Sequence, residues 1–220
     1  MDGKRKKTSY RLLDKFFSKK SDLKKLIPYL STPQISDSLK QVTGNQGIIP
    51  GVKSLNGQKL FGNIVTLCTK DDDWGTSIRG IDHSLPGEVI FIFTEGDENA
   101  VWGELTSKAA KKKGIAGTII FGACRDLDSI KTIKYPVFAR KVIPNAGMPL
   151  NEGKINITLD CQGTMVNPGD YLFGDECGVV VVPRENFIEV MEVAKEIKKR
   201  ENVIVKQIEE GKPLSKILDI

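Results

Sequence analysis

The stretch that indicates the fold is GIAGTIIFGACRD, residues 114–126. Its apolar run is suited to a buried strand, and the run ends at a cation and a carboxylate, Arg125 and Asp126. Charged side chains are costly to bury without partners, so two of them directly after a buried strand call for an explanation. We expect either a functional site at the end of this strand or an acid that begins a helix beside a solvated arginine.

Strands and helices alternate around this stretch. Upstream, we expect strands at 59–69 and 88–93, and the second, EVIFIF, is continuous enough to be covered on both faces. A helix is expected from about 102 to 113, ended by Gly114. Downstream we expect a strand at 117–121, a short helix at 126–133, a strand at 136–142, a hairpin-like pair formed by 154–160 and the segment after Gly163, and a strand at 179–183. This alternation predicts an α/β fold with a parallel sheet, whose ligand sites lie at the carboxyl ends of the strands.

Further helices are expected on both sides of this core. Residues 21–30 and 33–42 are short helical patterns, the second with Thr32 as N-cap, Pro33 at the first helical position and Gly44 as terminator. Near the C-terminus apolar residues repeat at helical spacing, at Phe187, Val190, Met191, Ala194 and Ile197.

Two strand ends occupy equivalent places in the pattern, FTEGDENAVWGEL (93–105) and FGACRD (121–126), because each leads into a helix. If these strands are neighbours, two helix N-termini converge on one crevice. The backbone N–H groups expected to point into it belong to Gly103, Glu104, Leu105 and Thr106. Such a site suits a carboxylate or a phosphate.

The two charged residues extend this hypothesis. Arg125 can bind the same anion through its planar guanidinium, and Asp126 can hold a hard cation such as Mg²⁺. An anion site beside a metal site implies a small oxyacid ligand. The two glycine-rich motifs that bind nucleotides, G-x-x-x-x-G-K-[ST] and G-x-G-x-x-G, are both absent from the sequence, so nucleotide binding has no support.

Charge and length limit the other functions. Residues 1–25 contain ten Lys/Arg and three Asp/Glu of the totals 33 and 28, so the remaining 195 residues are slightly acidic. The high isoelectric point therefore belongs to this segment, which is either a solvated extension with one docking helix or an arm that binds nucleic acid or a membrane surface. No signal peptide and no membrane span is expected, which points to the cytoplasm. We expect a basic extension at 1–25 and one domain at 26–220.

The thiols and the single imidazole predict no zinc site. Cys68, Cys124, Cys161 and Cys177 are widely separated, and zinc ligands are usually clustered. We interpret the cysteines as reduced, buried, small apolar residues. His83 precedes a Pro-Gly turn and is interpreted as a surface or strand-edge residue, with a general base as the alternative.

Residues 102–147 resemble the RraA-like family, which includes 4-hydroxy-4-methyl-2-oxoglutarate aldolases and the regulator of ribonuclease E activity. Two further segments, LSTPQISDSL (30–39) and VNPGDYLFGDECGVVVVPRE (166–185), carry the same resemblance, which runs in order from about Ser31 to Glu185. The resemblance implies a three-layer β/β/α swivelling fold with flanking N- and C-terminal helices. It also implies a homotrimer, sometimes paired into a hexamer.

The resemblance implies roles for the candidate residues as well. In the aldolases the loop that matches Gly103 to Thr106 binds substrate through its backbone, the match of Arg125 binds substrate, and the match of Asp126 carries the metal. Two positions depart from the family. Phe121 stands where an acid is common, which implies a less polar pocket, and Gly-Asp-Glu-Cys-Gly at 174–178 replaces Gly-Asp-x-Asp-Gly, which puts in doubt a metal or water contact from that loop.

Two functions follow from the resemblance. The first is a class II type, metal-dependent aldolase or decarboxylase that acts on small 2-oxo dicarboxylic acids through the enolate of pyruvate, with Mg²⁺ expected first and Mn²⁺ second. Its substrates would be 4-hydroxy-4-methyl-2-oxoglutarate and oxaloacetate. The sequence does not identify the general base, since a metal-bound water or an acid of a neighbouring subunit would serve. The second function is a non-catalytic regulator that binds an RNA-degrading enzyme.

Overall fold

The computed structural model describes residue 23 and residues 25–220. The basic extension expected at 1–25 lies almost wholly outside this range, as does the first part of the helix expected at 21–30. The described end of that helix is only a short 3-10 helix, η1 (Ile27–Tyr29), in which Pro28 lacks the N–H that a longer helix would need.

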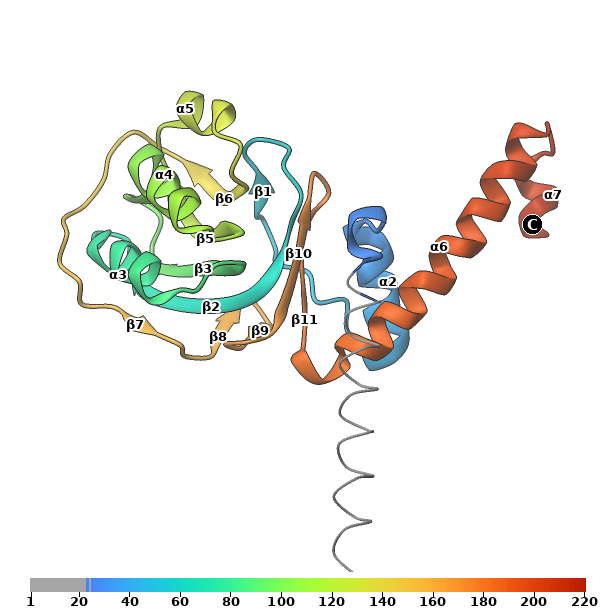
Figure 1. The fold of residues 1–220 in the computed structure, drawn as a ribbon, viewed down its shortest axis with the longest axis horizontal. Coiled ribbons are helices and arrows are strands. Elements are labelled where there is room, and N and C mark those ends of the chain that lie inside the picture. Colours follow the sequence, from blue (N-terminus) through green and yellow to red (C-terminus); the bar gives the residue numbers. More distant parts are fainter. Residues whose placement is uncertain (1–22, 24) are drawn as a thin grey trace, which may run out of the picture.

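In the described residues nine strands form one strongly curved sheet (Figure 1). Its main path runs through β1 (Lys53–Ser54), β6 (Val137–Val142), β5 (Gly117–Cys124), β3 (Glu88–Glu95), β2 (Leu60–Lys70), β10 (Tyr171–Asp175) and β11 (Gly178–Val182). The neighbours β2, β3, β5 and β6 are parallel, as predicted. Two short strands join this path, β4 (Ala100–Trp102) beside β5 and β7 (Lys154–Ile155) beside β2.

Strand β3 is buried on both faces, as its continuous apolar sequence predicted. Val89 and Phe91 point into a cluster enclosed by the curved sheet, and Ile90 and Ile92 point into a second cluster beneath the helices. The helices over this outer face are α3 (Gly75–His83), α4 (Glu104–Lys113) and α5 (Leu127–Thr132). A hairpin of β8 (Leu159–Cys161) and β9 (Thr164–Val166) adds side chains to the enclosed cluster. The chain is therefore a mixed α/β protein with a nearly closed sheet and flanking helices.

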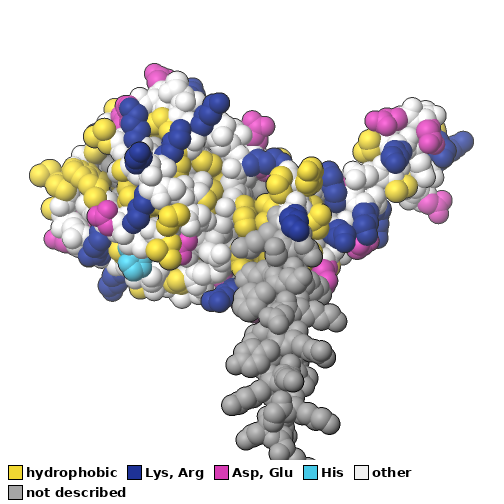
Figure 2. All heavy atoms as spheres, in the orientation of Figure 1, with side chains coloured by type: hydrophobic (Ala, Val, Ile, Leu, Met, Phe, Trp, Pro, Cys, Tyr) yellow, Lys and Arg dark blue, Asp and Glu magenta, His cyan; other side chains and the backbone are white. Residues whose placement is uncertain are grey.

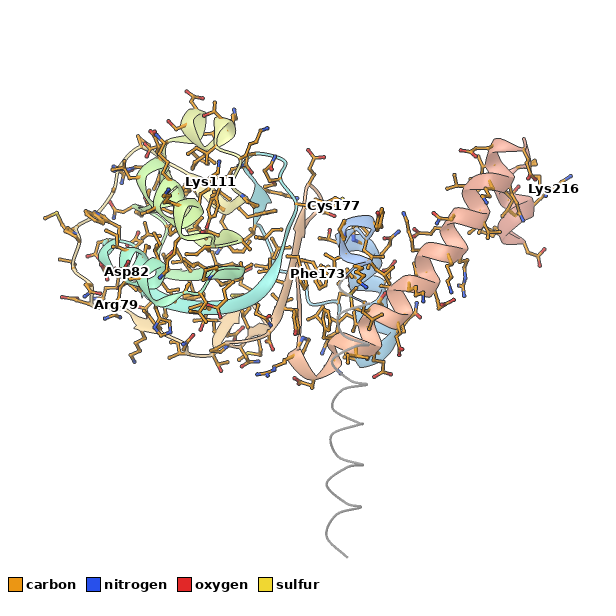
Figure 3. The ribbon with its side chains drawn as sticks, viewed as in Figure 1. Arg79, Asp82, Lys111, Phe173, Cys177 and Lys216 are labelled. Atoms are coloured by element: carbon orange, nitrogen blue, oxygen red, sulfur yellow. The ribbon has the colours of Figure 1, made fainter. Side chains whose placement is uncertain are left out.

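A third apolar cluster joins β10 and β11 to two helices, α2 (Thr32–Thr43) and α6 (Phe187–Glu209). Figure 3 shows Phe173 of β10 directed toward α2. The ring of Phe187 stacks on Tyr171 at 4.0 Å between centroids. The predicted C-terminal stripe is confirmed in its first four residues, which are buried, whereas Ile197 is only partly buried where α6 leaves the body toward α7 (Leu214–Leu218).

Two helix starts differ from the prediction. The N-cap of α2 is Ser31 and not Thr32, because the N–H and hydroxyl of Thr32 donate to the carboxylate of Asp175, at 2.8 and 2.6 Å. Helix α4 begins at Glu104 because Trp102 belongs to β4. Both expected C-terminal glycines, Gly44 and Gly114, have φ of +83° and end their helices, as predicted.

Four further elements, β1, α3, β4 and α7, were not expected from the sequence. The hairpin-like pair expected at 154–160 and after Gly163 is the β8 and β9 hairpin, while β7 pairs separately with β2.

No helix in the described part of the chain is long and apolar enough to cross a membrane.

A buried carboxylate holds the segment after β6 against the sheet. Asp73 is only 1 % exposed, and its oxygens accept hydrogen bonds from the N–H groups of Asn151 and Glu152 at 2.8 and 3.0 Å and from two threonine hydroxyls, those of Thr69 and Thr76. Burial alone would raise the pKa of Asp73, but the hydrogen bonds outweigh it and hold this pKa well below its ordinary 3.8.

We expect Asp73→Asn to lower the free energy of unfolding by about 3 kcal/mol at pH 7, because the amide group would face N–H donors that the carboxylate now satisfies. The Asp73 pKa is lowered in the fold, so its stabilisation is present above the ordinary value of 3.8 and is lost as the pH falls below it. Urea unfolding at pH 7 and near pH 3 measures both effects. Asp72→Asn is the control, since that side chain is exposed, and equal losses in both variants would contradict the prediction.

Candidate functional site

The two predicted strand ends meet in one pocket. Strands β3 and β5 are neighbours, and β4 lies along the end of β5, where Trp102 pairs with Cys124. A pocket of about 140 Å³ lies here, and its lining includes the segment from Gly103 to Thr106 together with Arg125 and Asp126. The structure thus brings all six candidate residues together.

The first turn of α4 is held by its own polar groups. The indole N–H of Trp102 donates to the hydroxyl of Ser107 at 2.8 Å, and that hydroxyl donates to the carbonyl of Gly103 at 2.7 Å. The N–H of Gly103 donates to the hydroxyl of Thr106 at 3.0 Å. Among the described residues no acceptor is found for the N–H groups of Leu105 and Thr106, so two of the four expected donors remain for a ligand.

The carboxylate of Asp126 takes up another of the four donors. The N–H of Glu104 donates to Oδ2 of Asp126 at 2.9 Å. Gly103 allows this approach, because a Cβ atom at that position would collide with the Asp126 carboxylate. Asp126 precedes α5 but does not cap it with its side chain. Its carboxylate instead accepts a hydrogen bond at the N-terminus of α4. Asp126 therefore does more than begin α5, which was the alternative considered for this residue.

Backbone contacts fix both charged residues at the end of β5. The N–H of Arg125 donates to the carbonyl of Trp102 at 3.0 Å, and Asp126 has a left-handed φ of 60°, a conformation that Asp tolerates better than most residues. The guanidinium Nε of Arg125 lies 3.7 Å from Oδ2 of Asp126, and their side chains are 44 % and 38 % exposed. The backbone therefore fixes where both side chains begin, and the guanidinium and the carboxylate remain accessible to solvent.

A divalent metal fits this site through one carboxylate. No group of three or more His, Cys, Asp and Glu that could hold a metal is found in the described range. Within the same range Oδ1 of Asp126 accepts no hydrogen bond, so it is available for a metal. Mg²⁺ is commonly bound through one or two carboxylates, with waters and substrate oxygens completing its shell. The site matches that pattern.

Two other titratable side chains near the pocket are occupied or inert. The carboxylate of Glu104 pairs with Lys108 and accepts from Ser129 at 2.8 Å, and these contacts, Lys108 first, lower its pKa. Burial raises the pKa of the Cys124 thiol to about 12, so it carries almost no thiolate at neutral pH. The Glu104 carboxylate is therefore engaged by Lys108 and Ser129 and is not a free acid.

Phe121 does not line the pocket, contrary to the expectation that it makes the pocket less polar. Its side chain belongs to the cluster enclosed by the sheet, where it stacks on Phe93 at 5.5 Å between ring centroids. The guanidinium of Arg140 lies 4.5 Å from the centre of the Phe121 ring. Alternation along β5 directs this side chain to the opposite face from the pocket.

The other residues singled out in the sequence also lie elsewhere. Asp175 is bound to the start of α2, and Cys177 lies exposed in the turn between β10 and β11 (Figure 3). The expectation that all cysteines are buried is confirmed for Cys124 and Cys161, but it is wrong for Cys177, and Cys68 is only partly buried. The four cysteines are free thiols. His83 is exposed at the end of α3 (cyan in Figure 2), and its Nε2 lies 2.9 Å from Nδ2 of Asn156.

Sequence reasoning missed the wall of the pocket that α3 supplies. Ile78 lies on α3, and Trp74 immediately precedes it and donates its indole N–H to the carbonyl of Gly147 at 3.0 Å. Gly75 and Gly80 weaken the helical signal of this short segment. The apolar spacing of Trp74, Ile78 and Ile81 is the pattern that would have indicated a helix.

An arginine, a carboxylate and open N–H groups at the ends of parallel strands are the kinds of group that can bind a small anion. The family model described as "RraA-like: Aldolase/RraA" matches residues 32–181. This chain belongs to the RraA-like family, as the resemblance predicted.

Several relatives resemble the chain over most of its length. An uncharacterized protein of Methanocaldococcus jannaschii is 43% identical over 180 residues, which cover 77% of this chain and 86% of that protein. A protein of Halalkalibacterium halodurans, provisionally named a 4-hydroxy-4-methyl-2-oxoglutarate aldolase, is 32% identical over 168 residues, covering 76% and 79% of the two chains.

Solved structures share the fold. A protein from Pseudomonas syringae superimposes with a TM-score of 0.80 at 28% identity, covering 89% of this chain and 96% of that chain. The RNA-processing inhibitor RraA from Thermus thermophilis superimposes with a TM-score of 0.61 at 24% identity, covering 67% and 92%.

Proposed function

We propose that this protein is a metal-dependent carbon-carbon lyase that cleaves small 2-oxo dicarboxylic acids and releases pyruvate. One observation carries the proposal: in a member of the RraA-like family, Arg125, Asp126 and the open N–H groups of Leu105 and Thr106 line one pocket. The aldolase name of a relative at 32% identity supports the same class of reaction.

Each group has a role that its chemistry suits. Arg125 and the N–H groups of Leu105 and Thr106 would bind the substrate carboxylate and offset the negative charge that develops on the pyruvate enolate as the bond breaks. Asp126 would hold the divalent cation through Oδ1, while the N–H of Glu104 keeps Oδ2 in place at 2.9 Å. When bound, the cation supplies a Lewis acid that polarises the 2-oxo group. Aldol cleavage and oxaloacetate decarboxylation pass through the same enolate, so one site can perform both.

Pyruvate release tests this function. We expect pyruvate from 4-hydroxy-4-methyl-2-oxoglutarate and from oxaloacetate when Mg²⁺ is present, with loss of at least about 90 % of the rate when the metal is chelated and recovery when it is added back. Pyruvate is followed by coupled reduction with lactate dehydrogenase. A rate that survives chelation would eliminate the metal-dependent mechanism, and no pyruvate from either substrate would eliminate the lyase.

We further propose that the protein is a homotrimer or a pair of trimers. The family resemblance and the exposed apolar side chains at Val203, Val205 and Ile208 of α6 support this assembly. Light scattering coupled to size exclusion should give three or six times the chain mass of 24.3 kDa. A monomer at micromolar concentration contradicts the proposal. If an interface completes the site, specific activity also falls on dilution.

A further inference from the structure

One wall of the pocket belongs to the β6–β7 connection, residues 143–153, the long loop that runs from β6 to β7 in Figure 1. Ala146 of this connection lies in the pocket lining and forms a β-bridge with Ala100, whose N–H donates to the carbonyl of Asn145 at 3.0 Å. Trp74, just before α3, lines the same pocket. The shape of the pocket therefore depends on where the connection lies.

Trp74 is attached to the β6–β7 connection by two hydrogen bonds. Its backbone N–H donates to the carbonyl of Met148 at 3.1 Å, and its indole N–H donates to the carbonyl of Gly147 at 3.0 Å. The N–H of Met148 in turn donates to the carbonyl of Asp72 at 2.6 Å. Gly147 permits this close packing, because a Cβ atom there would collide with the backbone of Asp72. Trp74 and the connection therefore hold each other in place.

Asp73, the neighbour of Trp74 in the chain, holds the far end of the connection. Its carboxylate accepts the N–H groups of Asn151 and Glu152 at 2.8 and 3.0 Å. The hydroxyl of Thr76 donates to the same carboxylate at 2.6 Å and accepts the N–H of Gly153 at 2.9 Å. One buried charge thus fixes three successive N–H groups of the connection, directly or through one hydroxyl.

These contacts lie within one chain and do not depend on the assembly. Asp73 is already 1 % exposed in a single chain, so another copy packed against the pocket has no access to its carboxylate. A wall that is ordered before the ligand arrives lowers the entropic cost of binding. A neighbouring subunit can add groups to such a pocket without replacing this wall.

We propose that Asp73 is a positioning residue, whose contacts hold the β6–β7 connection in the conformation that binds the substrate, with Trp74 and Ala146 as a fixed wall. The inference rests on the proposed function only for the class of ligand, a 2-oxo acid. Asp73 is absent from the pocket lining, so it acts through the connection and not by touching the ligand. Without its charge the ligand would have to order the connection on binding, and affinity would fall.

Titration calorimetry with pyruvate, the expected product, at saturating Mg²⁺ tests the inference. Asp73→Asn is expected to weaken pyruvate binding at least about tenfold, while Mg²⁺ affinity, titrated without pyruvate, stays within about twofold. Hydrogen exchange of the protein without ligand should become faster in the β6–β7 connection and stay slow in β3. Unchanged pyruvate affinity in the folded variant would overturn the inference, and so would an equal loss of Mg²⁺ affinity.

Asp170→Asn is the matched control for a loss of stability. Asp170 is 4 % exposed and accepts the N–H groups of Asn167 and Arg184 at 2.9 and 3.0 Å, but it lies outside the pocket lining. Urea unfolding is expected to show that this variant is also destabilised, whereas its pyruvate affinity should remain parental. If both variants lose pyruvate affinity equally, general destabilisation and not the position of the wall governs binding.

Gly147→Ala displaces the same wall while Asp73 stays intact. The added methyl group would collide with the backbone of Asp72, so the connection must shift. We expect weaker pyruvate binding, again about tenfold, with Mg²⁺ affinity retained. This variant decides the question even where Asp73→Asn is too unstable to titrate, because parental pyruvate affinity in Gly147→Ala would contradict the role of the wall.

The lyase and the positioning role can fail separately. Pyruvate binding that depends on Asp73, without turnover of any 2-oxo dicarboxylic acid, would keep the inference and reject the lyase. Turnover with a parental KM in Asp73→Asn would keep the lyase and reject the inference. Absence of pyruvate binding by the parental protein at saturating Mg²⁺ would reject the inference outright.

Discussion

Asp126→Asn is expected to abolish most of the Mg²⁺ affinity of the protein while leaving its fold intact. The amide oxygen of Asn can still accept the N–H of Glu104, now 2.9 Å from Oδ2, so the start of α4 keeps its cap. The negative charge is lost, and a hard cation that dehydrates reluctantly depends on it. We expect the loss of affinity to exceed the roughly 10–100-fold effect of removing an outer-shell partner. Titration calorimetry with Mg²⁺ measures this directly, and excess Mg²⁺ should restore part of the pyruvate release.

Asp128→Asn is the control for this experiment. Asp128 is exposed in the first turn of α5, next to the same strand end, but it does not line the pocket. Its substitution removes an equal charge and should leave Mg²⁺ affinity within about twofold. If both substitutions weaken Mg²⁺ binding equally, general charge and not ligation by Asp126 governs the affinity.

Arg125→Lys is expected to lower kcat/KM by about 100-fold, or about 2.7 kcal/mol, while Mg²⁺ binding survives. Lysine keeps the positive charge but cannot make the two parallel hydrogen bonds that a guanidinium makes with a carboxylate. The backbone of Arg125 is held by the carbonyl of Trp102 at 3.0 Å, so the shorter donor cannot easily move closer to compensate. Steady-state pyruvate release and Mg²⁺ titration together separate the two effects.

Arg184→Lys provides the comparison, because Arg184 is exposed in η2 (Arg184–Asn186) and lies outside the pocket lining. It should retain parental kcat/KM.

The two site variants should fail differently, Asp126→Asn in metal binding and Arg125→Lys in substrate binding. If both retain parental turnover and Mg²⁺ affinity, Arg125 and Asp126 have no catalytic role, and a non-catalytic regulator becomes the better hypothesis.

Much of the fold was predictable because its signals are local. The unbroken apolar sequence of β3 predicted burial on both faces, and Val89 and Ile90 indeed point into different clusters. Gly44 and Gly114 predicted two helix ends because glycine reaches a positive φ at little cost. The alternation of strands and helices also placed Arg125 and Asp126 at the carboxyl end of a parallel strand.

Other features could not be read from local patterns. The N-cap of α2 was misplaced by one residue because the partner of Thr32 is Asp175, which lies 143 residues away in the sequence. Helix α3 and strand β4 are short, and the sheet and the segment bound by Asp73 stabilise them more than their own sequences do. Their positions, and hence one wall of the pocket, depend on tertiary contacts.

Residue type and position at a strand end can be read along the chain, so the sequence indicated which side chains could take part in a reaction. The contacts that those side chains make depend on the folded structure. Tertiary packing directs the carboxylate of Asp126 to the N–H of Glu104, turns Phe121 away from the pocket, and brings Ile78 and Leu105 into the lining of one pocket. The physical reason is that hydrogen bonds and apolar contacts between distant segments depend on how the sheet curves and how helices pack on it, and no local pattern encodes those distances.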